Sequence, residues 1–284
     1  MQARRSPAAG ATSRRAAVLG MPVEHSLSPV LHNAAYAALG LSGWHYDRHA
    51  VDEAGLARFV AALGPEWAGL SLTMPLKRVA LQVADEVDPD AAAIGAANTL
   101  FRRNTAWRAA NTDVAGIAEA LRTVGVRRVE RAVVLGAGGT AQAAMAALRR
   151  LGETAPTVLV RDPARADALR ATADRLGLTP QITGGFPGHP LPPADVVVST
   201  LPAGAADPAA AGVRDPATVV LDVIYAPWPT ALAAAAAAAG CRVASGLDVL
   251  LHQAVEQVEL MTGRPGPTEV MRAALTAATS GRAR

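Results

Sequence analysis

The sequence predicts an α/β protein with two domains and mainly parallel sheets. Short apolar runs rich in valine alternate with helix-like stretches, which is typical of parallel strands joined by crossover helices. A glycine-rich turn at residues 136–139 joins one such run to a helix. The chain has 284 residues, which is enough for two domains with separate hydrophobic cores.

The composition is that of a folded protein without a membrane span. Hydrophobic residues make up 51% of the chain and charged residues 18%. The alanine-rich run at residues 231–239 is too short to cross a bilayer. The net charge is only +3 and no basic stripe with interleaved aromatic residues occurs, so we expect neither nucleic acid nor membrane as a partner. The single cysteine, Cys241, favours a reducing, cytoplasmic location.

The first half begins with an extension, residues 1–14, that is rich in arginine and alanine and is expected to be disordered. After it we predict strands at residues 16–20, 46–50 and 69–72 and helices at residues 29–39, 52–63 and 114–124. Pro29 suits the first turn of its helix, and Ser28 suits the N-cap.

Polar side chains occur in successive loops of this half, some of them just after the ends of predicted strands. Because the carboxyl ends of parallel strands meet at one edge of a sheet, such groups can converge on a polyol or carboxylate ligand. Ordinary structural roles compete: the serines as turn and cap residues, Lys77 as a surface charge, Asp113 as a helix cap. The candidates are Ser26, Ser28, Thr73, Lys77, Asn98 and Asp113.

The glycine-rich turn has the order strand, turn, helix that binds dinucleotides. Gly136 can make the tight turn, Gly138 can let a pyrophosphate approach the backbone, and Ala141 can pack helix on strand. The N-terminus of the helix expected at residues 140–151 supplies unpaired N–H groups to the phosphates. Glycine turns also begin helices for purely structural reasons, so the turn alone favours a Rossmann-type domain without proving it.

The next strand, at residues 157–160, ends about 20 residues beyond this turn, where the ribose of the adenosine is recognised. Arginine there favours the 2′-phosphate of NADP, and an acid favours the free hydroxyl of NAD. Arg161 and Arg165 favour NADP, while Asp162 keeps NAD possible. The remaining strands are predicted at residues 196–199, 219–223 and 242–244, and the remaining helices at residues 231–239, 248–261 and 269–279.

An ordered set of motifs across nearly the whole chain resembles the shikimate dehydrogenase family. The last motif contains Gln253, and a segment at residues 222–227 also looks like one of that family. In three places the sequence departs from the family: Val160-Arg161-Asp162 replaces Asn-Arg-Thr, only Thr200 of a second segment carries over, and Val249 stands where a methionine is common. The motifs are His25-Ser26-Leu27-Ser28-Pro29, Thr73-Met74-Pro75-Leu76-Lys77, Gly95 to Leu100, Asn111-Thr112-Asp113, the Gly136 turn, and Gly246 to Gln253.

The resemblance implies a substrate domain at residues 15–112, completed by C-terminal helices at residues 247–284, and a nucleotide domain at residues 113–246. It implies that Ser26 and Ser28 hold a carboxylate. The implied ring around the substrate hydroxyls is Thr73, Lys77, Asn98, Asp113, Tyr225 and Gln253. The implied cofactor residues are Gly136, Ala137, Gly138, Gly139, Thr140, Ala141, Arg161, Arg165, Thr200, Val223 and Gly246.

The implied reaction is reversible reduction of 3-dehydroshikimate to shikimate by NADPH, with Lys77 and Asp113 as the catalytic pair. A lysine amine is ordinarily protonated at neutral pH, so it can donate a proton and stabilise negative charge on oxygen. No metal is expected, because the histidines lack ligand spacing. Two alternatives stay open: an NAD-dependent quinate/shikimate dehydrogenase, and a non-catalytic nucleotide-sensing protein. The assembly is expected to be a monomer or a homodimer.

Overall fold

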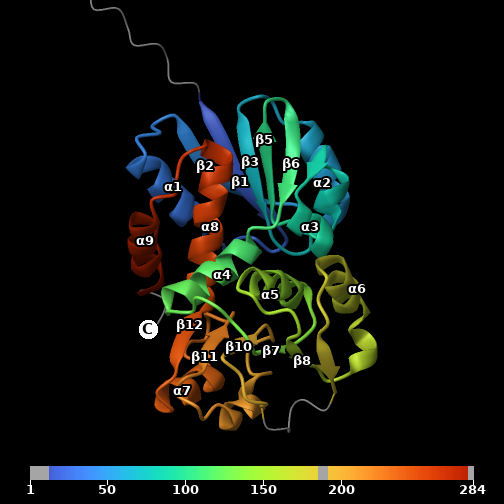
Figure 1. Cartoon of the computed structure of the whole chain (residues 1–284). Helices are drawn as coiled ribbons and strands as arrows, with labels where there is room; N and C mark the ends of the chain where they lie inside the picture. The colour runs from blue at the N-terminus through green and yellow to red at the C-terminus, as the bar shows by residue number, and fades with distance from the viewer. Residues whose placement is uncertain (1–12, 185–190, 281–284) are drawn as a thin grey trace, which may run out of the picture.

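Two six-stranded sheets, one in each half of the chain, organise the fold (Figure 1). The computed structural model describes residues 13–184 and 191–280. The first sheet and its helices fill the upper half of Figure 1, and the second sheet and its helices fill the lower half. The predicted α/β fold class is confirmed.

The first sheet has the strand order β2-β1-β3-β5-β6-β4. As predicted from the alternation of strands and helices, β1 lies parallel to both of its neighbours. Arg14 already pairs with Trp44 in this sheet, so the expected extension is too long at its C-terminal end; its residues 1–12 lie outside the described residues. The strands are β1 Arg14–Gly20, β2 Trp44–Ala50, β3 Trp67–Leu72, β4 Glu86–Val87, β5 Thr99–Arg103 and β6 Ala106–Ala110.

A β-hairpin that the sequence pattern did not predict completes this sheet. Strand β5 is antiparallel to both β3 and β6, so the sheet is mixed, although most of its pairings are parallel. Asn104 lies in the turn between β5 and β6 with a φ of 58°, a left-handed conformation that asparagine tolerates. The Arg102 guanidinium lies 4.6 Å from the centroid of the Trp107 ring on the facing strand. The hairpin places Asn98 immediately before β5 and Asn111 immediately after β6.

The second sheet is parallel throughout, with the order β12-β11-β10-β7-β8-β9. Counted from its first strand and read from the other edge, this is the order 3-2-1-4-5-6 of a Rossmann fold. The order reverses between β7 and β10, which is the point where such sheets bind ligands. The strands are β7 Ala132–Leu135, β8 Thr157–Leu159, β9 Gln181–Thr183, β10 Val196–Ser199, β11 Val219–Asp222 and β12 Arg242–Ser245.

The helices cover the sheets and join the two halves. Helix α4 packs against both α8 and α5 and lies across the middle of the molecule in Figure 1. The helices are α1 Ser28–Ala38, α2 Glu53–Ala61, α3 Pro89–Ile94, α4 Asp113–Thr123, α5 Gly139–Arg150, α6 Asp167–Leu176, α7 Ala231–Ala238, α8 Gly246–Thr262 and α9 Thr268–Ser280. Short 3-10 helices are η1 Val79–Gln82, η2 Pro163–Arg165 and η3 Asp207–Gly212.

The C-terminal helices return to the first half of the chain. Helices α8 and α9 pack against α1 through one apolar cluster, so the end of the chain covers its beginning (Figure 1). Ser245 and Asp248 form a capping box that fixes the start of α8. The cluster consists of Leu27, Leu31, Ala35, Leu251, Ala254, Val258, Met271 and Leu275.

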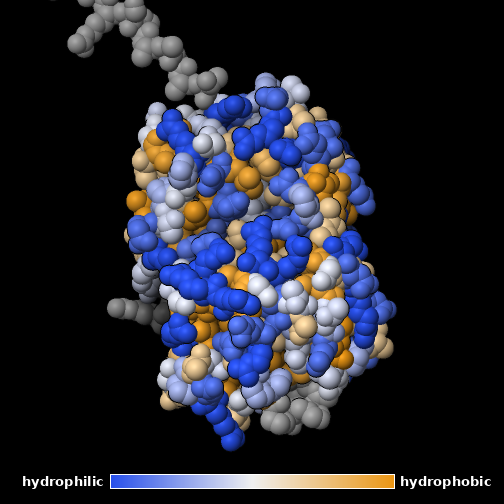
Figure 2. Space-filling model, viewed as in Figure 1, coloured by the Kyte–Doolittle hydropathy of each residue, from blue (hydrophilic) through white to orange (hydrophobic). Residues whose placement is uncertain are grey.

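The surface seen in Figure 2 is largely hydrophilic, with hydrophobic residues in small separated groups. The apolar side chains are instead gathered in the cores, of which the largest lies between α4, α5 and α6 and the second sheet. Within the described ranges, none of the helices combines the length and the apolar character that a bilayer crossing requires.

Candidate active site

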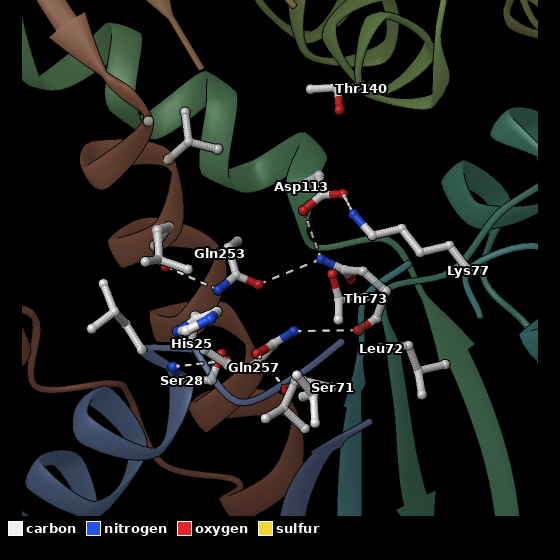
Figure 3. Close-up of a pocket in the computed structure, with 18 of the residues that line it drawn as sticks. His25, Ser28, Ser71, Leu72, Thr73, Lys77, Asp113, Thr140, Gln253 and Gln257 are labelled. Carbon is white, nitrogen blue, oxygen red and sulfur yellow. Dashed lines mark hydrogen bonds and ion pairs between the residues drawn. The ribbon is translucent and has the colours of Figure 1, made fainter. Parts of the chain in front are cut away.

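A cavity of about 420 Å³ lies where the two halves of the chain meet, and residues from both halves line it. Figure 3 shows Lys77 and Asp113 facing each other at this cavity, with Gln253 on one side and Thr140 of α5 beyond them. Every residue predicted for the substrate lines its wall: Ser26, Ser28, Thr73, Lys77, Asn98, Asp113, Tyr225 and Gln253.

Lys77 and Asp113 form an ion pair in this cavity. The Nζ atom of Lys77 lies 2.5 Å from Oδ2 of Asp113, and the two side chains are 32% and 17% exposed. Lys77 lies in the loop after β3, and its carbonyl accepts a hydrogen bond from the Ala97 amide, which ties this loop to the segment before β5. Asp113 is the first residue of α4, and its carboxylate accepts hydrogen bonds from the side chains of Lys77 and Asn98 instead of capping the helix. Lys77 is therefore not a free surface charge, and Asp113 does not act as a helix cap.

Asn98 connects this pair to the wall of the cavity. Its Oδ1 accepts a hydrogen bond of 2.8 Å from the amide N–H of Thr112, and because a backbone N–H can only donate, the orientation of the Asn98 side chain is fixed. Its Nδ2 therefore points to Oδ1 of Asp113, at 2.8 Å, and more weakly to Oε1 of Gln253, at 3.4 Å. Asp113 thus receives one donor on each carboxylate oxygen.

The two serines lie at the start of α1, and Ser28 is only 6% exposed. Ser28 is the first helical residue and Leu27 is the N-cap, with no side-chain capping bond, so the predicted capping role of Ser28 is wrong. The amide of Ser28 donates to Oγ of Ser26 at 3.3 Å. Ser28 lies at the cavity wall, and its hydroxyl is not engaged in capping α1.

Tyr225 reaches the cavity from the loop that follows β11 and is 41% exposed. Asp222 holds the two ends of this loop together: its carboxylate accepts hydrogen bonds from the Thr230 hydroxyl at 2.7 Å and from the Ile224 amide at 3.2 Å. Burial raises the pKa of Asp222, and these hydrogen bonds oppose that effect. These two hydrogen bonds of Asp222 hold the loop, and with it Tyr225, beside the cavity.

A second cavity, of about 690 Å³, lies over the glycine turn and the end of β8. Gly136 has a φ of +103°, and a Cβ there would lie 2.8 Å from Oγ1 of Thr200, so both conformation and space require glycine. A Cβ on Gly138 would meet nothing within 4 Å, so this backbone is open to a ligand. The predicted residues that line this cavity are Gly136, Ala137, Gly138, Arg161 and Arg165.

The first turn of α5 connects the two cavities, because Gly138 lines the second and Thr140 lines the first. The other predicted cofactor residues are distributed around this turn. Val223 and Gly246 line the first cavity. Gly139, Ala141 and Thr200 line neither: Ala141 is fully buried in the core, as expected for a position that packs helix on strand, and the Thr200 hydroxyl donates to the Leu135 carbonyl at 2.8 Å.

Arg161 and Arg165 are exposed at the rim of the second cavity. In the described part of the chain neither guanidinium has a carboxylate within 4.0 Å. Asp162 lies between them, but its Oδ1 accepts the Ala164 amide at 3.0 Å and caps η2. Two cations without an acidic partner suit a phosphate group more than a ribose hydroxyl.

Comparison with known proteins places the chain in a family. Two family models match it: the shikimate dehydrogenase substrate binding domain at residues 18–100 and the shikimate 5′-dehydrogenase C-terminal domain at residues 246–276. The shikimate dehydrogenase (NADP(+)) of Moorella thermoacetica is 37% identical over 268 residues, which cover 90% of either chain. This chain belongs to the shikimate dehydrogenase family.

Solved structures of shikimate dehydrogenases have the same fold as this family member. The shikimate dehydrogenase of Mycobacterium tuberculosis is 47% identical, with a TM-score of 0.84 over 93% of this chain and 99% of that one. The enzyme of Thermus thermophilus in complex with NADP(H) and shikimate is 32% identical, with a TM-score of 0.77 over 93% of this chain and 99% of that one.

Part of the site of this shikimate dehydrogenase family member was not predicted from its sequence. Ser71 and Gln257 line the first cavity, and both are buried. Gln257 lies one helical turn after Gln253, so a search of the same face of α8 could have found it. Ser71 gave no signal, because it lies within a strand whose residues are all buried. In the second cavity the missed residues are Leu159, Val160, Leu201, Pro202, Gly204, Ala205 and Pro208, while Asp162, which the sequence offered as a ribose contact, also lines it.

Behind Ser71 and Gln257 lie two buried aromatic residues, His32 and Tyr46, whose rings stack with centroids 4.0 Å apart. Burial lowers the pKa of His32 to about 3, although the hydrogen bond to Gln257 opposes this effect. Burial also raises the pKa of Tyr46. Both rings are therefore neutral at physiological pH. Where the structure describes the chain, it contains no group of three or more His, Cys, Asp or Glu that could hold a metal ion.

Proposed function

We propose that this protein catalyses the reversible, NADPH-dependent reduction of 3-dehydroshikimate to shikimate, in the biosynthesis of chorismate and the aromatic amino acids. The observation that carries the proposal is the Lys77–Asp113 pair, which lies in a cavity whose wall extends to Thr140 on the nucleotide-binding turn. The acid–base pair therefore lies next to a position that one end of a bound dinucleotide can reach.

The glycine turn and its surroundings fit NADP. Gly136 provides the tight turn, the open side of Gly138 leaves room for a pyrophosphate, and the N-terminus of α5 offers unpaired N–H groups. We assign Arg161 and Arg165 to the 2′-phosphate, which is supported by the engagement of Asp162 in capping η2. When bound, NADPH supplies the hydride that reduces the carbonyl carbon of the substrate.

Lys77 and Asp113 handle the charge that this reduction creates. As the carbonyl carbon gains a hydride, its oxygen becomes negative, and the ammonium of Lys77 stabilises the oxygen and gives it a proton. Asp113 holds Lys77 Nζ in place at 2.5 Å, and Asn98 holds Asp113. In the reverse direction, Lys77 takes the proton back from the hydroxyl group as the carbonyl forms.

The rest of the cavity wall suits the remainder of the substrate. We assign the hydroxyls of Ser26 and Ser28 to the carboxylate, because the two lie together at the start of α1. Thr73, Asn98, Tyr225 and Gln253 supply hydroxyl and amide groups for the ring hydroxyls. The related enzyme of Thermus thermophilus, which was solved with shikimate and NADP(H), supports both ligand assignments.

We also propose the domain division at residues 15–112 with 247–284 and residues 113–246, which is supported by the separate sheets and by the packing of α8 and α9 on α1. The single cysteine, which is buried and free, supports a cytoplasmic location. A monomer or a homodimer accommodates this site, since both cavities are built within one chain.

Initial rates of shikimate oxidation with NADP and with NAD test the proposal, with quinate measured in parallel. We expect a strong preference for shikimate with NADP. If quinate with NAD is faster, the protein is an NAD-dependent quinate/shikimate dehydrogenase and Asp162 recognises the ribose. If the protein binds the nucleotide but turns over neither polyol, it is a nucleotide-sensing protein instead.

A further inference from the structure

A buried hydrogen-bonded network runs from the core of the first half to the Lys77–Asp113 pair. It joins side chains from α1, β2, β3, β5 and α8, so it connects elements that are far apart in the sequence. Figure 3 shows Gln257, in the middle of this network, facing Ser71 from the same helix as Gln253. The members of the network are His32, Tyr46, Ser71, Gln257, Thr99, Asn98 and Asp113.

A backbone carbonyl fixes the orientation of Gln257. The Nε2 atom of Gln257 lies 3.4 Å from the carbonyl oxygen of Asn98, which can only accept, and 2.9 Å from Oγ1 of Thr99. The Oε1 atom therefore faces the other way, where the Ser71 hydroxyl donates at 2.7 Å and Nε2 of His32 donates at 3.2 Å. Turning the amide over would bring two oxygen acceptors together.

All the hydrogen-bonding capacity of Gln257 is used by the protein. Its oxygen accepts two hydrogen bonds and its nitrogen donates two, and the residue is only 1% exposed. Although Gln257 lines the cavity, no polar group of its side chain is left over for a substrate. Its influence on the reaction must therefore pass through its neighbours.

The neighbour that matters is Thr99. Because Gln257 donates to the Thr99 hydroxyl, the proton of that hydroxyl is directed elsewhere, and it is donated to Oδ1 of Asn98 at 2.8 Å. This bond reinforces the one from the Thr112 amide, and together they keep Nδ2 of Asn98 directed at Asp113. The direction of donation along the network is thus set by two backbone groups: the Asn98 carbonyl, which orients Gln257, and the Thr112 amide, which orients the Asn98 side chain.

We propose that Gln257 is a positioning residue for the reaction: it orients the Thr99 hydroxyl, which holds the Asn98 amide on Asp113. The proposal rests on the proposed function, because its effect is on the turnover of shikimate. Removing the amide of Gln257 frees the Thr99 proton to rotate away, so Asn98 moves more and the carboxylate that holds Lys77 is less well placed.

The test compares Gln257→Met, Thr99→Val and the double variant with the wild-type enzyme in shikimate oxidation. Both single changes keep the approximate volume and remove hydrogen-bonding atoms. We expect each to lower kcat about tenfold while the KM for shikimate changes less than threefold. The double variant is expected to lose no more than the worse single variant, because both changes break one link.

Tyr46→Phe is the matched control. It removes a buried hydrogen bond of 2.6 Å to Ser71 from the same network, but on the far side of Gln257. The Asn98 carbonyl still fixes Gln257, so we expect kcat to stay within twofold of the wild-type value. A thermal unfolding measurement on every variant checks that each one is folded. If Gln257→Met does not fold, Thr99→Val still tests the hydrogen bond between Gln257 and Thr99.

Several results would overturn the proposal. An unchanged kcat in Gln257→Met or Thr99→Val, a rise in KM alone, or losses that multiply in the double variant would each contradict a positioning role through Thr99. An equal loss of kcat in Tyr46→Phe would mean that general loosening of the core is responsible. Absence of shikimate turnover in the wild-type protein would instead contradict the proposed function.

Discussion

Acidification from pH 7 to pH 5 is expected to destabilise this protein through His32, which is fully buried. Burial lowers the pKa of His32 to about 3, whereas the same group titrates near 6.5 when it is exposed in the unfolded chain. Between these two values the unfolded chain binds a proton that the folded protein does not bind. The free energy of unfolding therefore falls as the pH drops below about 7, and this contribution is fully lost near pH 3.

Proton linkage gives the size of the effect. At pH 5 the unfolded state gains about 2 kcal/mol from protonation of this histidine, and at pH 7 it gains only about 0.2 kcal/mol. His32 alone thus removes about 2 kcal/mol of stability between these pH values, a large fraction of the ~5–15 kcal/mol typical of a domain. The figure at pH 5 hardly changes for any folded-state pKa below about 4.

Urea unfolding at both pH values, followed by tryptophan fluorescence, measures this effect. Three of the four tryptophans, Trp44, Trp67 and Trp107, lie in strands of the first sheet, which is the half that contains His32. The variant is His32→Phe, which retains a ring against Tyr46 but does not titrate. We expect it to lose about 2 kcal/mol less than the wild-type protein between pH 7 and pH 5.

Tyr36→Phe is the control for this experiment. Tyr36 is also buried, its hydroxyl has no hydrogen-bond partner among the described residues, and burial raises its pKa well above 10, so it does not titrate in this range. This variant is expected to show the wild-type loss of stability on acidification. If His32→Phe shows the same loss as well, the reasoning from burial is refuted, because the folded protein then accepts a proton on His32.

Three further predictions concern the site and its supports. Lys77→Met is expected to lower kcat about 10²–10⁴-fold with an unchanged unfolding transition, and a loss under tenfold would remove Lys77 from proton transfer. Replacing Arg161 and Arg165 by glutamine is expected to raise the KM for NADP at least tenfold while that for NAD stays within threefold; equal changes would reject the 2′-phosphate assignment. Gly246→Ala is expected to lower the free energy of unfolding by about 2 kcal/mol or more in urea unfolding, since its Cβ would overlap the carbonyl oxygen of Val223. Gly139→Ala, where the Cβ meets open space, is expected to stay within about 0.5 kcal/mol of the wild-type protein.

The parallel units of this fold could be predicted from the sequence because their signals are local. The run Ala132–Leu135 is buried on both faces and ends at a glycine that must adopt a positive φ, and both properties are visible in the residue types. The hairpin of β5 and β6 carries no such signal, since Arg102, Arg103 and Arg108 interrupt any apolar alternation. Its arginines are accommodated by aromatic rings and carboxylates that only the folded chain supplies.

The candidate site likewise contains residues that local sequence predicts and residues that only the folded structure brings together. Lys77 follows strand β3 and Asp113 begins helix α4, so their place at one edge of the sheet follows from the order of elements along the chain, whereas Asn98 lies just before strand β5 of the unpredicted hairpin. Gln257 meets Thr99 and Ser71 across 158 and 186 positions, which no local pattern specifies. The direction of its hydrogen bonds is set by the Asn98 carbonyl, a group that every residue possesses, so it can be read only from geometry. Residue types thus indicate which groups can react, while the fixed donors and acceptors of the backbone decide how they are held.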